Sequence, residues 1–171
     1  NKLLISITDI ILRNFKQPFI NRSNESPMRA NYLSADTRKD IPQSVARALA
    51  EDIGSGDITA QLIPEDKQAT AVVISREAAV ICGRPWVDEV FQQLAKDTEI
   101  EWHISEGDSV EANQKLFTLT GNARVLLTGE RAALNFLQTL SATATVASEY
   151  AALAPNSEIK ILDTRKTIPG L

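Results

Sequence analysis

The longest helical pattern of the chain spans Asn122–Leu153 and reads NARVLLTGERAALNFLQTLSATATVASEYAAL. Leucine, phenylalanine and alanine side chains cover more than half of its helical circumference, including Leu134, Phe136 and Leu137. A helix that is apolar over so much of its surface is buried on most sides. The pattern therefore predicts a largely buried helix, and we expect a break near Ser141.

A polar stripe interrupts this apolar surface. Arg131, Asn135 and Gln138 follow one another at i, i+4 and i+7, so they share one side of the helix. A buried charge without a partner costs several kcal/mol, so an anion is expected near Arg131. That anion is either a protein carboxylate, although the adjacent Glu130 points elsewhere on the helix, or an acidic ligand. The spacing leaves both partners open.

A shorter amphipathic helix is predicted upstream of this segment. Asp40 can cap it with Pro42 in its first turn, Val45, Leu49 and Ile53 repeat at i, i+4 and i+8, and Gly54 offers a left-handed exit.

The segment between these two helices mixes strands with one further helix. Residues 69–83, ATAVVISREAAVICG, are typical of a β-hairpin, and residues 86–95, WVDEVFQQLA, have the apolar face of a helix. Two more strands are expected at residues 98–104, TEIEWHI, and 115–121, KLFTLTG, with the turn SEGDS between them. Helices combined with hairpin-linked strands predict an α+β sandwich with antiparallel pairing.

The character of the chain changes after the long helix. Ile159, Ile161 and Leu162 predict a buried strand of the kind that opens a parallel, helix-covered sheet. The loop after it, DTRKT at residues 163–167, would lie at the carboxyl end of that strand, where α/β barrels hold their sites. Thr164, Arg165 and Lys166 combine hydroxyl, guanidinium and ammonium donors, which suits a small polyanion. The alternative is that the two cations are simply solvated.

Composition excludes several classes of partner. The net charge of -4 disfavours nucleic acid and anionic membranes, and the short, Asp9-interrupted apolar run near the beginning of the chain is below the ~20 residues that cross a bilayer. One cysteine, Cys82, and one histidine, His103, provide neither a disulfide framework nor a metal cluster, so a cytoplasmic setting and no metal site are expected.

Three segments are predicted. Residues 1–40 form a leader, disordered or non-native up to residue 27, because Met28 is the only methionine and an expected natural start. Residues 41–143 form an amino-terminal sandwich domain, and residues 144–171 begin an α/β barrel that this sequence does not complete.

Three stretches resemble quinolinate phosphoribosyltransferase, also called carboxylating nicotinate-nucleotide pyrophosphorylase. They are EDIGSGDIT (51–59), LLTGERAALNFLQTLS (126–141) and LDTRKTIPGL (162–171), in the family's order. The resemblance implies an α/β sandwich joined to an α/β barrel. It also implies phosphoribosyl transfer from phosphoribosyl pyrophosphate to quinolinate with decarboxylation, giving nicotinate mononucleotide, pyrophosphate and CO2 in NAD biosynthesis, with magnesium accompanying the pyrophosphate.

The resemblance also implies roles for individual residues. Thr164, Arg165 and Lys166 match positions that hold the dicarboxylate of quinolinate, and Arg131 matches an arginine contributed across the dimer interface. A homodimer is thus the smallest expected assembly. No residue of the chain is identified as catalytic in the sense of a nucleophile.

The sequence departs from the family pattern in two respects. LSATAT (140–145) stands where the family usually has LSGIAT, and the sequence ends inside the DTRKT motif, before the later barrel strands with the acids that bind ribose and metal. The 171-residue chain alone is therefore expected to lack activity. The alternative to an enzyme is an inactive fragment or pseudo-enzyme that only binds a small dicarboxylate or a partner chain.

Overall fold

The computed structural model describes residues 33–54, 56 and 58–153 and consists of helices packed against antiparallel sheets. In chain order the elements are α1 (Ala35–Ile53), α2 (Ile58–Gln61), β1 (Gln68–Ile74), β2 (Ala79–Val80), α3 (Arg84–Leu94), β3 (Glu99–Trp102), β4 (Ser109–Val110), β5 (Lys115–Asn122) and α4 (Ala123–Leu153). The α+β sandwich expected from the sequence is confirmed for this part of the chain. Residues 1–32 of the expected leader and the expected barrel strand lie outside the described residues, whereas residues 35–40, which are also expected in the leader, belong to α1.

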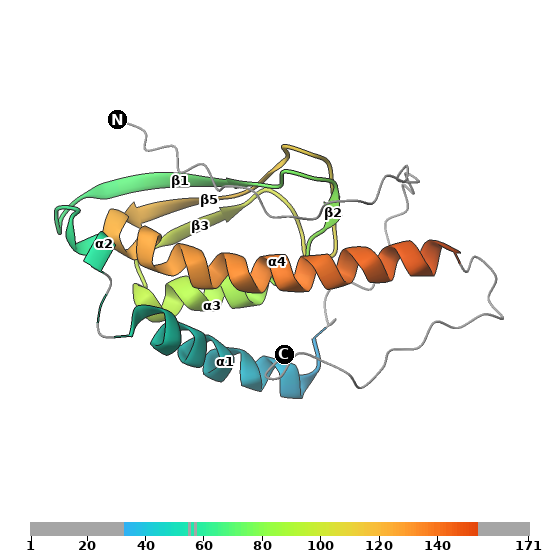
Figure 1. Ribbon diagram of the computed structural model, residues 1–171, viewed down its shortest axis with the longest axis horizontal. Coiled ribbons are helices and arrows are strands. Elements are labelled where there is room, and N and C mark those ends of the chain that lie inside the picture. Colours follow the sequence, from blue (N-terminus) through green and yellow to red (C-terminus); the bar gives the residue numbers. More distant parts are fainter. Residues whose placement is uncertain (1–32, 55, 57, 154–171) are drawn as a thin grey trace.

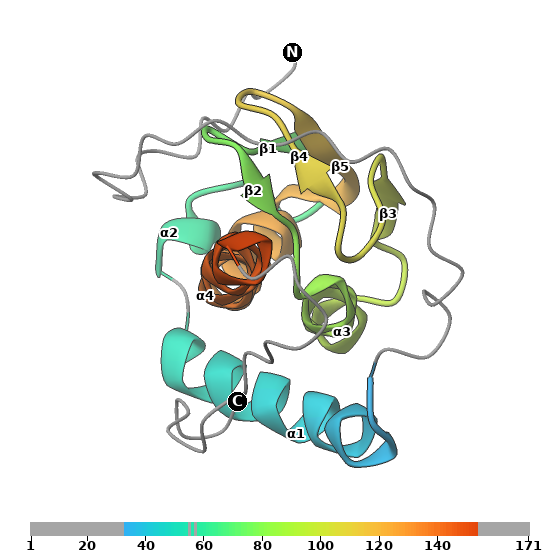
Figure 2. The same cartoon turned by 90° about the vertical axis from the view of Figure 1, so that its right-hand side faces the viewer.

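The elements form layers (Figures 1 and 2). A three-stranded antiparallel sheet in the order β1-β5-β3 covers α3 and α4, and α1 packs beneath these two helices on the side away from the sheet. β2 and β4 form a separate two-stranded sheet. Phe117 of β5, Phe91 of α3 and Leu126 of α4 are among the most deeply buried side chains. The core therefore lies between the large sheet and the pair formed by α3 and α4.

The first helix begins earlier than the sequence predicts. Ser34, and not Asp40, is its N-cap: the Ser34 hydroxyl accepts a hydrogen bond from the backbone N–H of Thr37 at 3.0 Å. Pro42 consequently lies inside α1 instead of in its first turn, and its carbonyl accepts a hydrogen bond from Gln93 of α3. The helix ends at Gly54 as predicted, and this residue has a positive φ of 51°, but its ψ of -121° differs from that of the expected left-handed conformation.

The predicted hairpin at residues 69–83 is wrong. β1 pairs with β5, whereas β2 pairs with β4, so the two strands belong to different sheets. Side chains of α4 provide hydrogen-bond partners for the β2 segment: the Thr145 hydroxyl accepts from the N–H of Val80 at 2.9 Å, and the Ser141 hydroxyl accepts from that of Cys82 at 3.0 Å. Hydroxyl groups on a helix thus substitute for a neighbouring strand, which a strand pattern alone does not reveal.

The expected break near Ser141 is also wrong, since α4 is continuous. The Ser141 hydroxyl both accepts from the N–H and donates to the carbonyl of Cys82, and the hydroxyls of Thr143 and Thr145 donate to backbone carbonyls four residues earlier in α4. These local bonds allow hydroxyl residues to remain within a helix. At the other end, β5 passes directly into α4, and the Asn122 side chain accepts from the N–H of Arg124 at 2.9 Å.

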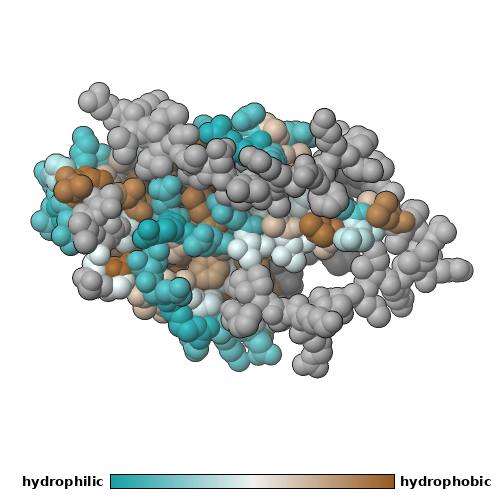
Figure 3. Space-filling view, in the orientation of Figure 1, coloured by the Kyte–Doolittle hydropathy of each residue, from teal (hydrophilic) through white to brown (hydrophobic). Residues whose placement is uncertain are grey.

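The last turns of α4 expose an apolar face. Val146, Tyr150 and Leu153 follow at i, i+4 and i+7, and the other described residues leave them exposed, as the apolar surface along this end of α4 indicates in Figure 3. None of the helices in the described ranges combines the length and apolar character needed to span a membrane.

Helices α3 and α4 touch at Gly129. A Cβ atom there would lie 2.6 Å from Cε1 of Phe91 and 2.8 Å from Cδ1 of Leu94. Phe91 is 1% exposed, so its ring has no solvent into which it could move. Glycine is required here by close packing and not by backbone conformation.

We therefore predict that Gly129→Ala lowers the free energy of unfolding by about 1–3 kcal/mol through overpacking. Alanine favours a helix over glycine by only about 1 kcal/mol, so the clash outweighs the gain in helix propensity. Urea unfolding followed by circular dichroism measures the difference. Ala132→Gly, a change between the same two residue types three positions along α4, is the control for propensity and a small cavity. A Gly129→Ala protein as stable as the unchanged one would contradict the packing argument.

Candidate functional site

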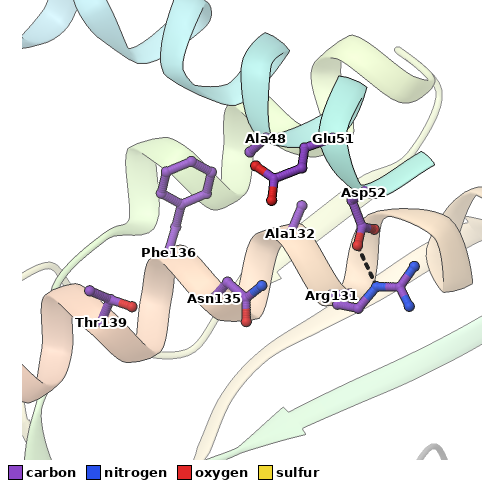
Figure 4. A pocket seen from close by; sticks show the side chains of 8 residues that line it. All are labelled: Ala48, Glu51, Asp52, Arg131, Ala132, Asn135, Phe136 and Thr139. Atoms are coloured by element: carbon purple, nitrogen blue, oxygen red, sulfur yellow. Dashed lines mark ion pairs between the residues drawn. The ribbon is translucent and has the colours of Figure 1, made fainter. Parts of the chain in front are cut away.

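The predicted site residue within the described part of the chain, Arg131, lies where α4 crosses α1. It lines a hollow of about 410 Å³ together with other α4 residues and with the last turns of α1 (Figure 4). The lining residues are Ala48, Glu51, Asp52, Arg131, Ala132, Asn135, Phe136 and Thr139. The lining combines polar side chains, among them Arg131 and Asn135, with apolar ones such as Phe136.

Arg131 makes an ion pair with Asp52. Its Nε lies 2.5 Å from Oδ1 of Asp52, across the gap between α4 and α1. The sequence left a protein carboxylate and an acidic ligand open as partners, and the structure provides the carboxylate from a helix that sequence reasoning had not connected with Arg131. Glu130, the adjacent acid, is not the group that forms this pair; burial raises the pKa of its carboxyl group.

The burial of the pair is uneven. The Arg131 side chain is 65% exposed and that of Asp52 only 19%. The expectation that Arg131 lies on the buried surface of the helix is therefore wrong: the apolar residues Ala132, Ala133 and Phe136 are buried, and the arginine lies at the solvent edge. A guanidinium in this position can reach a group outside the sandwich, while the backbone of Arg131 is held in α4.

Asp52 is the functional candidate that sequence reasoning missed. It lies in the last turn of α1, where the partial negative charge of the helix end disfavours a carboxylate. Its Oδ2 is buried and has no hydrogen-bond partner among the described residues. An acidic residue in the last turn of a predicted helix, inside a stretch already singled out at residues 51–59, was the available signal.

The predicted polar stripe divides between two faces of α4. Asn135 lines the same hollow as Arg131, but Gln138 lines a different cavity of about 160 Å³ on the side toward β1 and β2. Thr139, four residues after Asn135, continues the Arg131 face instead. Arg131, Asn135 and Thr139, each four residues apart, therefore lie on the side of α4 that faces α1. Gln138, three residues after Asn135, lies on the side toward β1 and β2.

The remaining predicted site residues, Thr164, Arg165 and Lys166, lie outside the described residues. Their approach to an acidic ligand, or to Arg131, stays a prediction. Within residues 33–54, 56 and 58–153, no group of three or more His, Cys, Asp or Glu side chains is arranged to hold a metal ion.

Burial, with Glu106 nearby, raises the pKa of Cys82 to about 12, so this thiol stays protonated and is a poor nucleophile near neutral pH.

The sandwich of helices and antiparallel sheets matches the fold of part of a class of phosphoribosyltransferase. Residues 57–141 match the family described as quinolinate phosphoribosyl transferase, N-terminal domain. A solved nicotinate-nucleotide pyrophosphorylase from Francisella tularensis is 47% identical with a TM-score of 0.74, covering 78% of this chain and 48% of that one. The chain belongs to the quinolinate phosphoribosyltransferase family and carries its amino-terminal domain.

Relatives from distant organisms agree with this assignment. A probable carboxylating nicotinate-nucleotide pyrophosphorylase of Bacillus subtilis is 36% identical over 121 residues, which is 71% of this chain and 42% of that protein. The chloroplastic enzyme of Arabidopsis thaliana is 36% identical over 134 residues, 77% of this chain and 38% of that protein. The chain thus spans less than half the length of these relatives.

We predict that Arg131→Ala leaves the fold intact and lowers the free energy of unfolding by about 1 kcal/mol. This value lies at the upper end for exposed ion pairs, because the substitution leaves the mostly buried Asp52 carboxylate without its cation. Thermal unfolding by circular dichroism measures the loss, expected to be a few degrees. Arg47→Ala, which breaks an exposed pair with Asp40 on α1, should have no measurable effect. A loss of more than about 3 kcal/mol would instead identify the Asp52 pair as a major structural support.

Proposed function

We propose that the protein whose amino-terminal domain this chain carries transfers a phosphoribosyl group from phosphoribosyl pyrophosphate to the nitrogen of quinolinate. Decarboxylation of the product then gives nicotinate mononucleotide, pyrophosphate and CO2, a step of NAD biosynthesis. The observation that carries the proposal is the match to this family over residues 57–141, together with 47% identity to the Francisella tularensis pyrophosphorylase.

The residues of the chain fit the demands of this reaction. Quinolinate has two ring carboxylates, and a cluster of cations both binds them and stabilises the negative charge left on the ring as CO2 departs. Arg131 is proposed to provide one guanidinium, with Thr164, Arg165 and Lys166 providing the others. The ribose carbon becomes cationic during transfer, so no protein nucleophile is needed, and orientation of the two substrates is the main task of the protein.

Arg131 is proposed to act across a dimer interface. Its side chain is 65% exposed at the edge of the sandwich, a position suited to contact with a second subunit. We propose a homodimer as the smallest active assembly, and magnesium as the ion that accompanies the pyrophosphate, neutralising its charge when bound. The acids expected to bind that ion and the ribose belong to the barrel strands that follow this sequence in the family.

We also propose a cytoplasmic location. A sequence with a single cysteine, which offers no internal disulfide, is in keeping with a reducing compartment. The names of several plant relatives place them in mitochondria or chloroplasts, whereas that of the Bacillus subtilis relative names no organelle.

In the full-length protein, Arg131→Ala and Arg165→Ala should each weaken quinolinate recognition by about 1.5–3 kcal/mol, the contribution of a hydrogen bond to a charged group. The KM for quinolinate, measured from nicotinate mononucleotide formation, checks this expectation. Unchanged values for Arg131→Ala would contradict its proposed role.

Mixing these two variants tests the arrangement across the interface. In a hybrid dimer, the site with an intact Arg165 receives an intact Arg131 from the other subunit, and the second site has neither. With equal mixing, half of the dimers are hybrids with one native site of two, so about a quarter of native activity should return. No recovery after confirmed subunit exchange would show that Arg131 and Arg165 serve the same subunit's site.

The 171-residue chain alone is expected to form no nicotinate mononucleotide from quinolinate, phosphoribosyl pyrophosphate and magnesium, because it spans less than half the length of its relatives. Product above a no-protein control that disappears with Lys166→Ala would contradict this expectation. Calorimetric titration with quinolinate tests the alternative, a chain that only binds a small dicarboxylate. Heat of binding that Lys166→Ala removes would support that alternative.

A further inference from the structure

We propose that Asp52 is a positioning residue for Arg131, holding Nε of its guanidinium so that the terminal nitrogens have a defined direction for binding the dicarboxylate substrate. This inference rests on the proposed function and deepens it, since it identifies what orients the substrate-binding arginine. Asp52 itself contacts no substrate in this arrangement.

The geometry of the pair supports this role. Arginine has a planar fork of donors, and Asp52 engages it at Nε. Figure 4 shows one terminal nitrogen on the same side of the guanidinium as Asp52 and the other pointing away from Asp52. An anion that approaches the terminal nitrogens therefore meets an edge of the guanidinium whose direction the carboxylate has set.

The difference in burial between the partners determines which of them is fixed. Asp52 is held between α1 and α4 with 19% of its side chain exposed, so packing restricts its rotamers. Arg131 is 65% exposed, and a long exposed side chain samples many rotamers unless a partner restricts it. The buried carboxylate is thus the anchor, and the arginine is the group that gains a defined orientation.

Asp52 is also poorly explained by stability alone. It places a negative charge in the last turn of α1, against the helix dipole, and buries Oδ2 without a hydrogen-bond partner among the described residues. Both features oppose folding. Groups that are unfavourable for folding tend to lie at functional sites. The Asp52 carboxylate contacts Arg131, the arginine that is proposed to bind quinolinate.

The test uses Asp52→Asn in the full-length protein, which removes the charge while nearly preserving the shape. We expect the KM for quinolinate to rise about tenfold, within the range of coupling between contacting residues, with little change in the KM for phosphoribosyl pyrophosphate. Asp52→Glu should recover part of the loss. Asp40→Asn, the same substitution at an exposed ion pair of α1, should change neither constant.

A double-mutant cycle separates positioning from other effects. If Asp52 acts through Arg131, Asp52→Asn should have no further effect on quinolinate KM once Arg131 is alanine. An equal effect in both backgrounds, or no effect in the native one, would overturn the proposal. If Arg131→Ala leaves quinolinate KM unchanged, the assigned role of Arg131 fails first; if only Asp52→Asn is silent, the positioning role fails and the proposed function stands.

A measurement on the 171-residue chain tests the pairing without catalysis and covers the case of a poorly folded full-length variant. The ¹H–¹⁵N signal of Arg131 Nε, assigned by its loss in Arg131→Lys, should shift and exchange faster with water in Asp52→Asn. It should be unchanged in Asp40→Asn. An Arg131 Nε signal that Asp52→Asn does not alter would show that Asp52 does not orient the guanidinium.

Discussion

The contact between α3 and α4 at Gly129 determines where the other elements lie. With no Cβ at this position, Phe91 and Leu94 pack directly against the backbone of α4. The two helices then form one layer that the β1-β5-β3 sheet covers on one side and α1 on the other. Arg131 lies two residues after Gly129, so the same contact that closes the core also brings the arginine to α1 and Asp52.

Helix α4 joins the layers because its different faces satisfy different kinds of partner. Its apolar face is buried in the core, Ser141 and Thr145 bond the backbone of the β2 segment, and Arg131 reaches α1. These hydroxyls accept hydrogen bonds from backbone N–H groups of the β2 segment, as the carbonyls of a neighbouring strand would. Serine and threonine can disrupt a helix by bonding to nearby backbone groups. Here their hydroxyls bond to the β2 segment or to carbonyls of the preceding turn, so α4 stays unbroken and makes all three contacts.

Local patterns in the sequence predicted what depends on local periodicity. The apolar repeat of Val45 and Leu49, the exit at Gly54 and the α+β class are all present in the structure. Three features depended on tertiary partners that no local pattern contains. Ser34 replaces Asp40 as the cap, β1 pairs across 40 intervening residues with β5 instead of with β2, and Ser141 bonds Cys82 instead of ending its helix. The site shows the same division. A partner for Arg131 was expected from charge alone, but Asp52 lies 79 positions away in the chain and became visible only when α1 packed on α4.

The uneven burial of the Arg131–Asp52 pair suits recognition better than stabilisation. A pair exposed on both sides would contribute about 0–1 kcal/mol and would leave the arginine free to reorient, and a pair buried on both sides would direct the guanidinium inward. Here the carboxylate is fixed by packing while most of the cation faces solvent. Burying one carboxylate oxygen costs free energy of folding. In return the arginine side chain is already ordered before the dicarboxylate arrives, so less side-chain entropy is lost on binding.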